Sequence, residues 1–483
     1  MKLTELLKGL EYNQKFEDKE ITSLCCDTRQ VKKDSLFFCF KGKQTDGHKF
    51  AGEALEKGAA FVVAERSLGL ENEVVVEDTK KAYAVCCANL YDNPQKKVKL
   101  IGVTGTNGKT STTYLIRDIL KESGIRCGLI GTVVNETPES VVPSKFTTPD
   151  SLSFYSLLHE MVKARCEYVV VEVSSFGLEQ RRVWGCHFDI SLFTNLTQDH
   201  LDYHDTMENY YKAKKLLFDV SDKAVICIDD DYGKRMASEV PCQVRTFSIK
   251  DDMADYTAKS INLTLENTSY AFVGKGIIER IKYPCLGMFS VSNSMGAVAL
   301  TSEMGINPET AKKAISHAEG VPGRFELIKV DTPFKVIRDF AHTPDGLEKV
   351  LDALRTVCKD GRIVVLFGNA GNRDRSKRAK MVRTVAERAD FVILSSDNPR
   401  HEDPMQIIND GLPGFDGLDV EKKVIPDRYE AITWALKNCH KGDILLLAGK
   451  GHEDYQVLDH GTVHFDEREI VREIWENLKN KEE

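Results

Sequence analysis

Short apolar runs alternate with helix-length segments along most of this 483-residue chain. The run VKLIGVTG ends in glycine, and the TSTTYLIRDILKESG that follows has the apolar spacing of a helix and a glycine stop. Similar runs recur as YVVVEVSS, DISLFTNL and KAVICIDD, each before a polar or helical stretch. Buried parallel strands give such continuous apolar runs, so the pattern predicts a largely parallel sheet covered by helices on both faces.

The same pattern divides the chain into three predicted α/β domains. Residues 1–95 hold short mixed segments and end at the turn-like YDNPQ, which indicates a small α/β domain. Residues 96–325 carry the central sheet. Residues 326–483 contain FKVIRDFA, RIVVLFGNAG, DFVILSSDNP and DILLLAGKG, which predict a doubly wound, Rossmann-like domain. In such sheets ligands bind beyond the carboxyl ends of the strands, where the polar clusters of this sequence fall.

The composition of the chain argues against several classes of binding partner. The 66 basic and 74 acidic residues give a net charge of −8 without a basic block, which argues against nucleic acid. No apolar run reaches the roughly 18 residues of a membrane span, and MKLTELLKGL lacks a signal-peptide core. Thirteen cysteines without a CxxC pair indicate neither a disulfide framework nor a zinc site. We therefore expect a cytoplasmic protein without a membrane partner.

A glycine loop between the first central strand and its helix predicts a phosphate site. Its glycines let backbone N–H groups curl around phosphate oxygens at a helix N-terminus, with Lys109 near the terminal phosphates and Thr110 on Mg2+. The strict pattern GxxxxGK[ST] is not met, because its first glycine falls on Val103. A tight structural turn is the alternative, and the loop alone does not separate a ligase from a kinase, a GTPase or a regulator. The loop residues are Gly105, Thr106, Asn107, Gly108, Lys109, Thr110 and Ser111.

Several motifs spread over the chain carry a family resemblance. TGTNGKT, VEVSSFGLEQRRV, TNLTQDHLDYH, AKKLLF and DFAHTPDGLEK together resemble the Mur ligases and their folylpolyglutamate synthetase relatives. DNPR and AGKGHEDYQ extend the match into the last domain, and the group that makes UDP-N-acetylmuramoyl tripeptides is the most similar. The resemblance implies a three-domain α/β fold with a P-loop-type central parallel sheet and a Rossmann-like C-terminal domain.

The resemblance also implies a reaction. Joining a carboxylate to an amine in water requires a better leaving group than oxide, and phosphate from ATP supplies one. The expected course is an acyl phosphate, attack by the amine through a tetrahedral intermediate, and release of ADP and phosphate, with Mg2+ and cationic groups around the γ-phosphate. The expected substrates are UDP-N-acetylmuramoyl-L-alanyl-D-glutamate and meso-2,6-diaminopimelate, in peptidoglycan precursor synthesis, and a monomer is expected.

Catalytic and nucleotide-binding positions follow from the resemblance residue by residue. Lys109 and His200 are expected to be catalytic, and so is Lys214, at the position where these ligases carry a carbamylated lysine. That modification needs a neutral amine, hence a lysine whose pKa is lowered by burial. Taken singly, such residues are more often structural. Metal ligands are expected at Thr110, Glu172, His200 and Lys214, and nucleotide contacts at Asn293, Arg324, Asp339 and His342.

The first domain resembles the UDP-binding module of the family. Cys26 departs from the usual aliphatic residue at its position, whereas the other expected contacts offer hydroxyl, amide or cationic groups that suit a sugar nucleotide with a peptide carboxylate. The expected UDP contacts are Cys26, Thr28, Lys43, Gln44 and Thr45, and the expected muramoyl contacts are Thr147, Thr148, Ser174, Gln180 and Arg182.

The DNPR motif indicates which amino acid is added. Family members with arginine at its fourth position generally add meso-diaminopimelate, whose distal carboxylate an arginine can bind with two parallel hydrogen bonds. A proline-containing turn is the plain alternative. Asn372 stands where an aspartate is common. The expected contacts are Arg373, Asp397, Asn398, Pro399, Arg400, Gly449 and Glu453.

Three other interpretations remain open at this point. The same reaction with L-lysine, or a sister ligase of the folylpolyglutamate type, is opposed by Arg400 and by the UDP-type first domain. A nucleotide-binding regulator without ligase activity predicts changes at the catalytic positions, and Lys109, Glu172, His200 and Lys214 are all present. A scaffold protein predicts repeats or heptads, which the sequence lacks.

Overall fold

The first sheet is small and parallel. The computed structural model describes residues 1–12, 16–42, 45–264 and 267–482. Within them, the first sheet has the strand order β1-β2-β3-β4, and its two central strands are buried along their whole length. The elements are α1 (Leu3–Leu6), β1 (Ser23–Cys25), β2 (Ser35–Phe38), α2 (Ala51–Glu56), β3 (Ala59–Ala64), β4 (Glu73–Val75) and α3 (Thr79–Leu90).

The central sheet is larger and mixed. Its order is β15-β14-β13-β12-β11-β10-β5-β9-β6-β7-β8, and the strands from β13 to β6 are parallel. Antiparallel hairpins extend both edges. The strands are β5 (Lys99–Thr104), β6 (Cys127–Ile130), β7 (Val134–Glu136), β8 (Val141–Pro143), β9 (Tyr168–Glu172), β10 (Ile190–Phe193), β11 (Lys223–Cys227), β12 (Gln243–Ser248), β13 (Tyr256–Leu263), β14 (Thr268–Gly274) and β15 (Ile277–Tyr283).

Helices cover both faces of the central sheet, because successive side chains of a buried strand point to opposite sides. On β5, Ile101 and Val103 belong to the core under α4, α10 and α11, whereas Leu100 belongs to the core under α5 and α8. The helices are α4 (Lys109–Glu122), α5 (Ser151–Lys163), α6 (Ser175–Glu179), α7 (Leu201–His204), α8 (Met207–Lys215), α9 (Asp231–Glu239), α10 (Met288–Glu303) and α11 (Pro308–Ser316).

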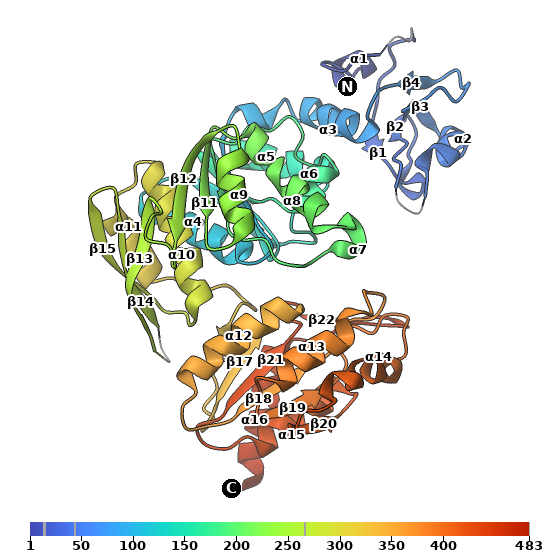
Figure 1. Ribbon diagram of the computed structural model, residues 1–483. Helices are drawn as coiled ribbons and strands as arrows, with labels where there is room; N and C mark the ends of the chain where they lie inside the picture. The colour runs from blue at the N-terminus through green and yellow to red at the C-terminus, as the bar shows by residue number, and fades with distance from the viewer. Residues whose placement is uncertain (13–15, 43–44, 265–266, 483) are drawn as a thin grey trace.

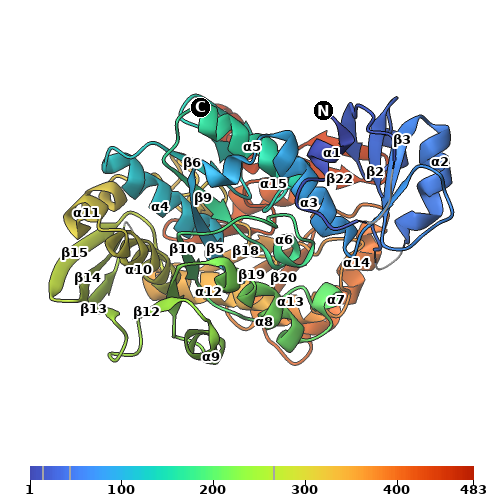
Figure 2. The same ribbon diagram turned by 90° about the horizontal axis from the view of Figure 1, so that it is seen from above.

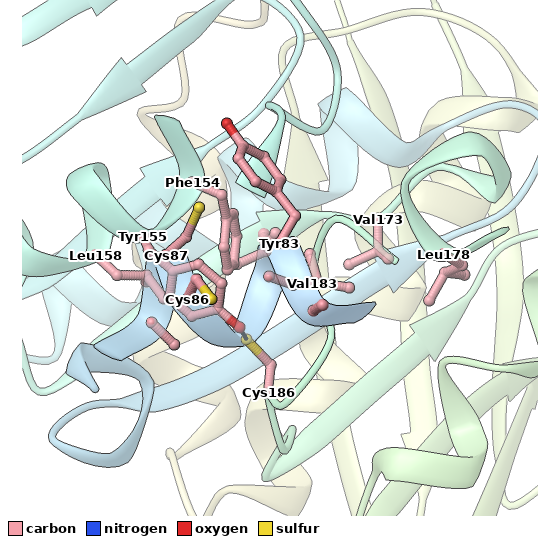
Figure 3. Close-up of a cluster of buried hydrophobic side chains, with 14 of the residues drawn as sticks. Tyr83, Cys86, Cys87, Phe154, Tyr155, Leu158, Val173, Leu178, Val183 and Cys186 are labelled. Atoms are coloured by element: carbon pink, nitrogen blue, oxygen red, sulfur yellow. Dashed lines mark hydrogen bonds between the residues drawn. The ribbon is translucent and has the colours of Figure 1, made fainter. Parts of the chain in front are cut away.

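A continuous apolar core joins the first sheet to the central one. Helix α3 lies between them in Figures 1 and 2, and its Tyr83, Cys86 and Cys87 gather with Phe154 and Tyr155 of α5 (Figure 3). Phe154 and Tyr155 have no exposed surface. Burial of this apolar area stabilises the pair of sheets as one body.

The C-terminal sheet is doubly wound. Its order is β16-β17-β21-β18-β19-β20, and β16 alone runs antiparallel to its neighbour. On β18, Ile363 and Val365 face α12 and α13, whereas Val364 and Leu366 face α15 and α16. The elements are β16 (Glu326–Leu327), β17 (Lys335–Asp339), α12 (Pro344–Val357), β18 (Ile363–Phe367), α13 (Lys377–Ala386), β19 (Phe391–Leu394), α14 (Pro404–Gly411), β20 (Glu421–Val424), α15 (Arg428–Asn438), β21 (Ile444–Ala448), β22 (Tyr455–Leu458), β23 (Gly461–His464) and α16 (Glu467–Glu482).

The fold class predicted from the sequence is confirmed: an α/β protein with a parallel central core and a Rossmann-like C-terminal sheet. The antiparallel edges of the central sheet were not predicted. The boundaries at residues 95 and 325 stay predictions, and each of the four sheets within the described ranges falls inside one of the three segments. No helix in the described ranges is both long and apolar enough to span a bilayer.

Candidate active site

A cavity of about 1820 Å³ draws its lining from all three parts of the chain. The carboxyl ends of β5, β17, β19 and β21 meet there, as the topology of open parallel sheets requires. The predicted residues that line it are Thr45, Thr106, Asn107, Gly108, Lys109, Thr110, Ser111, Thr147, Gln180, His200, Asn293, Arg324, Asp339, His342, Arg373, Asp397, Asn398, Arg400, Gly449 and Glu453.

The phosphate loop is shaped by two glycines. Gly105 has φ +149° and Gly108 has φ +85°, in the range that side chains other than glycine's rarely adopt. A Cβ atom on Gly108 would lie 2.2 Å from Asn293 Oδ1, and one on Gly105 would lie 1.8 Å from Thr194 Oγ1. Only glycine fits at both positions, which brings the loop backbone against α10 and β10.

Lysine ammonium groups converge on the start of this loop. Lys109 Nζ donates to Gly105 O at 3.0 Å and to Thr106 O at 2.8 Å, and Lys214 Nζ donates to Gly105 O at 2.8 Å. Burial lowers the pKa of Lys214 well below its ordinary value, and the nearby charge of Lys109 acts in the same direction. Burial also lowers the pKa of Lys109. Lys214 is therefore closer to the neutral form that can react with CO2 than a solvated lysine is.

Oxygen donors lie next to the loop at the end of β9. Thr110 Oγ1 donates to Glu172 Oε2 at 3.1 Å, and Thr132 Oγ1 donates to the same oxygen at 2.8 Å. Glu172 is fully buried. Carboxylate and hydroxyl oxygens are the ligands that Mg2+ prefers, so Thr110 and Glu172 fit such an ion. Among the described residues, no three His, Cys, Asp or Glu side chains lie close enough together to hold a metal ion. A carbamate on Lys214 would add one more carboxylate ligand.

His200 follows the loop after β10 in the left-handed region, with φ 53°. Desolvation lowers its pKa to about 4, and the charges of Lys109, Lys214 and His342 act in the same direction against the opposing charge of Asp199. The imidazole is therefore neutral at pH 7, the form in which histidine binds metal. His200 Nε2 lies 3.3 Å from Asp199 Oδ2, and Lys377 of α13 also contacts Asp199, at 3.0 Å.

Residues at the junction with the C-terminal sheet approach the loop. Arg324 Nη2 donates to Thr110 Oγ1 at 3.4 Å, and its guanidinium stacks on the Phe340 ring with the centroid 4.5 Å away. Burial raises the pKa of Asp339, against the opposing charge of Arg324 and the backbone N–H groups of Phe325 and Ala341. His342 Nδ1 lies 2.7 Å from Phe340 O, and His342 lines the cavity.

The predicted muramoyl contacts form one hydrogen-bond network. Thr148 Oγ1 donates to Glu172 O at 2.8 Å and lies 3.0 Å from Ser174 Oγ, which caps α6. Arg182 donates to Gln180 Oε1 at 2.8 Å and to Thr148 O at 2.6 Å, and it forms no ion pair with any residue that the structure describes. A guanidinium without a carboxylate partner suits a carboxylate ligand. Thr147 Oγ1 lies 3.1 Å from Thr132 Oγ1.

The predicted UDP contacts are only partly brought together. Thr45 lines the cavity, whereas Cys26 and Thr28 follow β1 and do not line it. Desolvation raises the pKa of the Cys26 thiol to about 11, so it is not a reactive thiolate. Lys43 and Gln44 lie outside the described residues. The uridine diphosphate roles of all five stay predictions.

The predicted amino-acid contacts lie after β18, β19 and β21 and have a basic and an acidic half. Arg373 and Arg400 repel one another electrostatically, and burial is the main cause that lowers the pKa of Arg400. Neither forms an ion pair within the described ranges. Arg400 Nη1 donates to Gly371 O at 2.8 Å, and Asn398 Nδ2 donates to Glu453 Oε2 at 2.8 Å. Pro399 contributes backbone packing against Gly371 instead of lining the cavity.

The structure adds residues that the motifs alone did not single out. Asp345 lies within DFAHTPDGLEK, Lys377 within GNAGNRDRSKR, and Lys450 within AGKGHEDYQ. Each belongs to a motif of the sequence, but only its contacts with distant segments distinguish it from its neighbours. Asn372, at a position where an aspartate is common in the family, has φ 52° and accepts a hydrogen bond from His401 N at 3.2 Å, which stabilises the turn.

A phosphate loop that faces a Rossmann-like sheet across one cavity defines a three-domain, nucleotide-binding α/β protein. Three family descriptions match the chain: "Mur ligase family, catalytic domain" at residues 20–91, "Mur ligase middle domain" at 103–301 and "Mur ligase, glutamate ligase domain" at 323–451. The chain belongs to the Mur ligase family, as the motifs predicted.

Individual relatives agree with this assignment. The UDP-N-acetylmuramoyl-L-alanyl-D-glutamate--2,6-diaminopimelate ligase of Clostridium tetani is 43% identical over 490 residues, which cover 99% of this chain and 100% of the relative. A solved structure of a ligase with the same name is 32% identical, with a TM-score of 0.69 and 99% of both chains covered. MurF ligase from Thermotoga maritima in complex with ADP shares the fold, with a TM-score of 0.62 and 19% identity over 95% of this chain and 98% of the other.

Proposed function

We propose that this chain is an ATP-dependent ligase that joins meso-2,6-diaminopimelate to UDP-N-acetylmuramoyl-L-alanyl-D-glutamate through an acyl phosphate. The product would be a peptidoglycan precursor made in the cytoplasm, by a monomer. The names of the relatives support the reaction. Among observations on this chain, the pair of guanidinium groups without carboxylate partners, Arg373 and Arg400, carries most weight, because it faces the same cavity as the phosphate loop.

The proposed acceptor has charges that match the two halves of its site. Its distal carboxylate would bind Arg400, which has the fork geometry for two parallel hydrogen bonds. Its distal ammonium would bind Glu453, whose side chain faces the same cavity. L-Lysine has no distal carboxylate and would leave Arg400 unpaired in a partly desolvated site.

The proposed nucleotide site uses the loop of residues 105–111. Its backbone N–H groups and the Lys109 ammonium would bind the phosphates of ATP, and Arg324 would stabilise charge that develops during phosphoryl transfer. Mg2+ bound at Thr110 and Glu172 would neutralise phosphate oxygens. Asn293 of α10 and His342, which follows β17, both line the cavity and would contact the nucleoside.

The donor substrate would extend from the loop toward the first sheet. Arg182, fixed by Gln180 and Thr148, would hold the peptide carboxylate near the phosphate loop. Lys214, as a carbamate, would be a further oxygen ligand for a metal ion, which would neutralise charge on the reacting oxygens. The proposed domains are residues 1–95 for UDP, 96–325 for ATP and 326–483 for the amino acid.

The test is phosphate release from ATP with the UDP-linked dipeptide and Mg2+, comparing meso-diaminopimelate, L-lysine and L-ornithine. We expect turnover with diaminopimelate, and its loss in Arg400→Ala but not in Arg472→Ala, an exposed arginine of α16 in the same domain. Turnover with lysine that persists in Arg400→Ala would support a ligase but would refute diaminopimelate as its acceptor. No turnover with any acceptor would refute the reaction.

A further inference from the structure

We propose that Lys450 is a positioning residue of the amino-acid site: its buried ammonium fixes Asn398 and Glu453 and sets the charge of the site for a substrate with two carboxylates. This inference rests on the proposed function. Lys450 follows β21 between two glycines with positive φ, Gly449 at +109° and Gly451 at +53°, and this turn carries its side chain inward. The side chain is fully buried.

Three polar groups of the site surround the ammonium. Lys450 Nζ lies 3.3 Å from Glu453 Oε2, 3.4 Å from Asn398 Oδ1 and 3.7 Å from Asp397 Oδ1. Glu453 Oε2 also accepts from Asn398 Nδ2 at 2.8 Å. Glu453, which would hold the distal ammonium of the substrate, is therefore fixed by both Asn398 and Lys450.

Apolar rings close the remaining sides. The centroids of Tyr455 and Phe465 lie 5.7 Å and 5.8 Å from Lys450 Nζ. A buried ammonium is costly unless it is paired and hydrogen-bonded, so Lys450 strongly favours the arrangement in which both carboxylates stay beside it. Asp397 Oδ1 is buried and accepts no hydrogen bond from any described residue, and the Lys450 ammonium, 3.7 Å away, compensates its charge.

The net charge of the proposed contacts depends on this lysine. Arg373, Arg400 and Lys450 against Asp397 and Glu453 leave one net positive charge. An amine must be neutral to attack an acyl phosphate, so reacting diaminopimelate carries two carboxylates and one ammonium, a net charge of −1. Reacting L-lysine carries no net charge. Lys450 therefore supplies the charge that favours the diacid.

The experiment compares Lys450→Met, which removes charge and donors, with Lys450→Gln, which keeps a donor. Lys437→Met, at an exposed lysine of α15, is the control. In Lys450→Met we expect KM for diaminopimelate to rise about ten-fold or more, the scale of a lost charge-assisted hydrogen bond. KM for ATP and for the UDP-linked dipeptide should stay within about two-fold. The ratio of kcat/KM for diaminopimelate to that for lysine should fall in both Lys450 variants, and less in Lys450→Gln.

An unchanged KM for diaminopimelate in folded Lys450→Met would overturn the proposal. An equal rise in KM for all three substrates would also overturn it, because it would indicate a structural role, and so would failure of both Lys450 variants to fold while Lys437→Met folds. Failure of the proposed function is distinguishable, because the unmodified protein itself would show no turnover with diaminopimelate.

Discussion

Asp345 Oδ2 accepts a hydrogen bond from Asn107 Nδ2 at 2.8 Å, across 238 positions of the chain. Asn107 belongs to the phosphate loop, and Asp345 belongs to the first turn of α12, a helix that packs on the C-terminal sheet. The same oxygen accepts from Thr197 Oγ1 at 3.0 Å and from Lys349 Nζ at 2.9 Å. One carboxylate thus ties the position of the C-terminal sheet to the loop that would hold ATP.

Replacing Asp345 should impair use of the nucleotide. In Asp345→Ala, Asn107 and Thr197 lose an acceptor with full charge, so we expect kcat/KM for ATP to fall about ten-fold. Asp345→Asn keeps a carbonyl acceptor and should lose less. Asp360→Ala, at an exposed turn of the same domain, is the control for steady-state kinetics. Equal kinetics in Asp345→Ala and the control would contradict the link.

Gly108→Ala should abolish nucleotide binding. A Cβ at φ +85° is strained and would lie 2.2 Å from Asn293 Oδ1, so the loop or the Asn293 side chain, both expected to contact the nucleotide, must move. Gly124→Ala is a matched control, because Gly124 at the end of α4 has a similar φ of +76° and a Cβ added there would meet no atom within 4 Å. Calorimetric titration with ATP should give heat in Gly124→Ala and none in Gly108→Ala. Binding of ATP by both would show that the loop does not hold the phosphates.

Lys214 should form a carbamate. Its lowered pKa favours the neutral amine, and the modification converts a cation into a carboxylate. With 13C-labelled bicarbonate we expect a carbamate resonance in the 13C NMR spectrum that is lost in Lys214→Gln. Lys212→Gln, at an exposed lysine of the same helix, should keep it. A resonance that persists in Lys214→Gln would assign the carbamate to another amine.

Phe154→Ala should destabilise the joint between the first and central sheets. Phe154 has no exposed surface, and large-to-small substitution of such a ring typically costs about 3–5 kcal/mol. Phe146→Ala, at a phenylalanine that is 54% exposed, should change the unfolding temperature little. Differential scanning calorimetry would compare the two. A similar small effect of both would mean that the joint adds little to stability.

His452 should make stability fall at mild acidity. Burial lowers its pKa from 6.5 to about 4, and the charges of Arg324 and Arg338 act in the same direction. Above pH 6.5 the imidazole is neutral in both states, whereas between pH 6.5 and about 4 the unfolded chain binds a proton that the folded chain resists. Stability is therefore lost as pH falls through this window. The drop in unfolding temperature from about pH 7 to about pH 5 should shrink in His452→Gln, but not in His460→Gln, at an exposed histidine. Equal drops would assign the acid sensitivity to other groups.

The parallel strands were predictable because both faces of each are buried. The runs LIGV within VKLIGVTG and ILLLA within DILLLAGKG are apolar without interruption, and the glycines after them are where the chain turns into the cavity. The strand β14 alternates buried and half-buried positions, and β15 alternates exposed with less exposed positions, so neither gave a continuous run and both were missed. One solvated face is the physical reason.

The sequence by itself determined which motifs carry the chemistry, since the type and spacing of residues in TGTNGKT or DNPR are local properties. Only the tertiary structure decided which of them meet. Asp345 reaches Asn107, Lys377 reaches Asp199, and Lys450 is enclosed with Asn398 because separate strands end at one cavity. Burial and electrostatic environment depend on that packing, so the lowered pKa of Lys214 and the enclosed ammonium of Lys450 could not be derived from the order of residues alone.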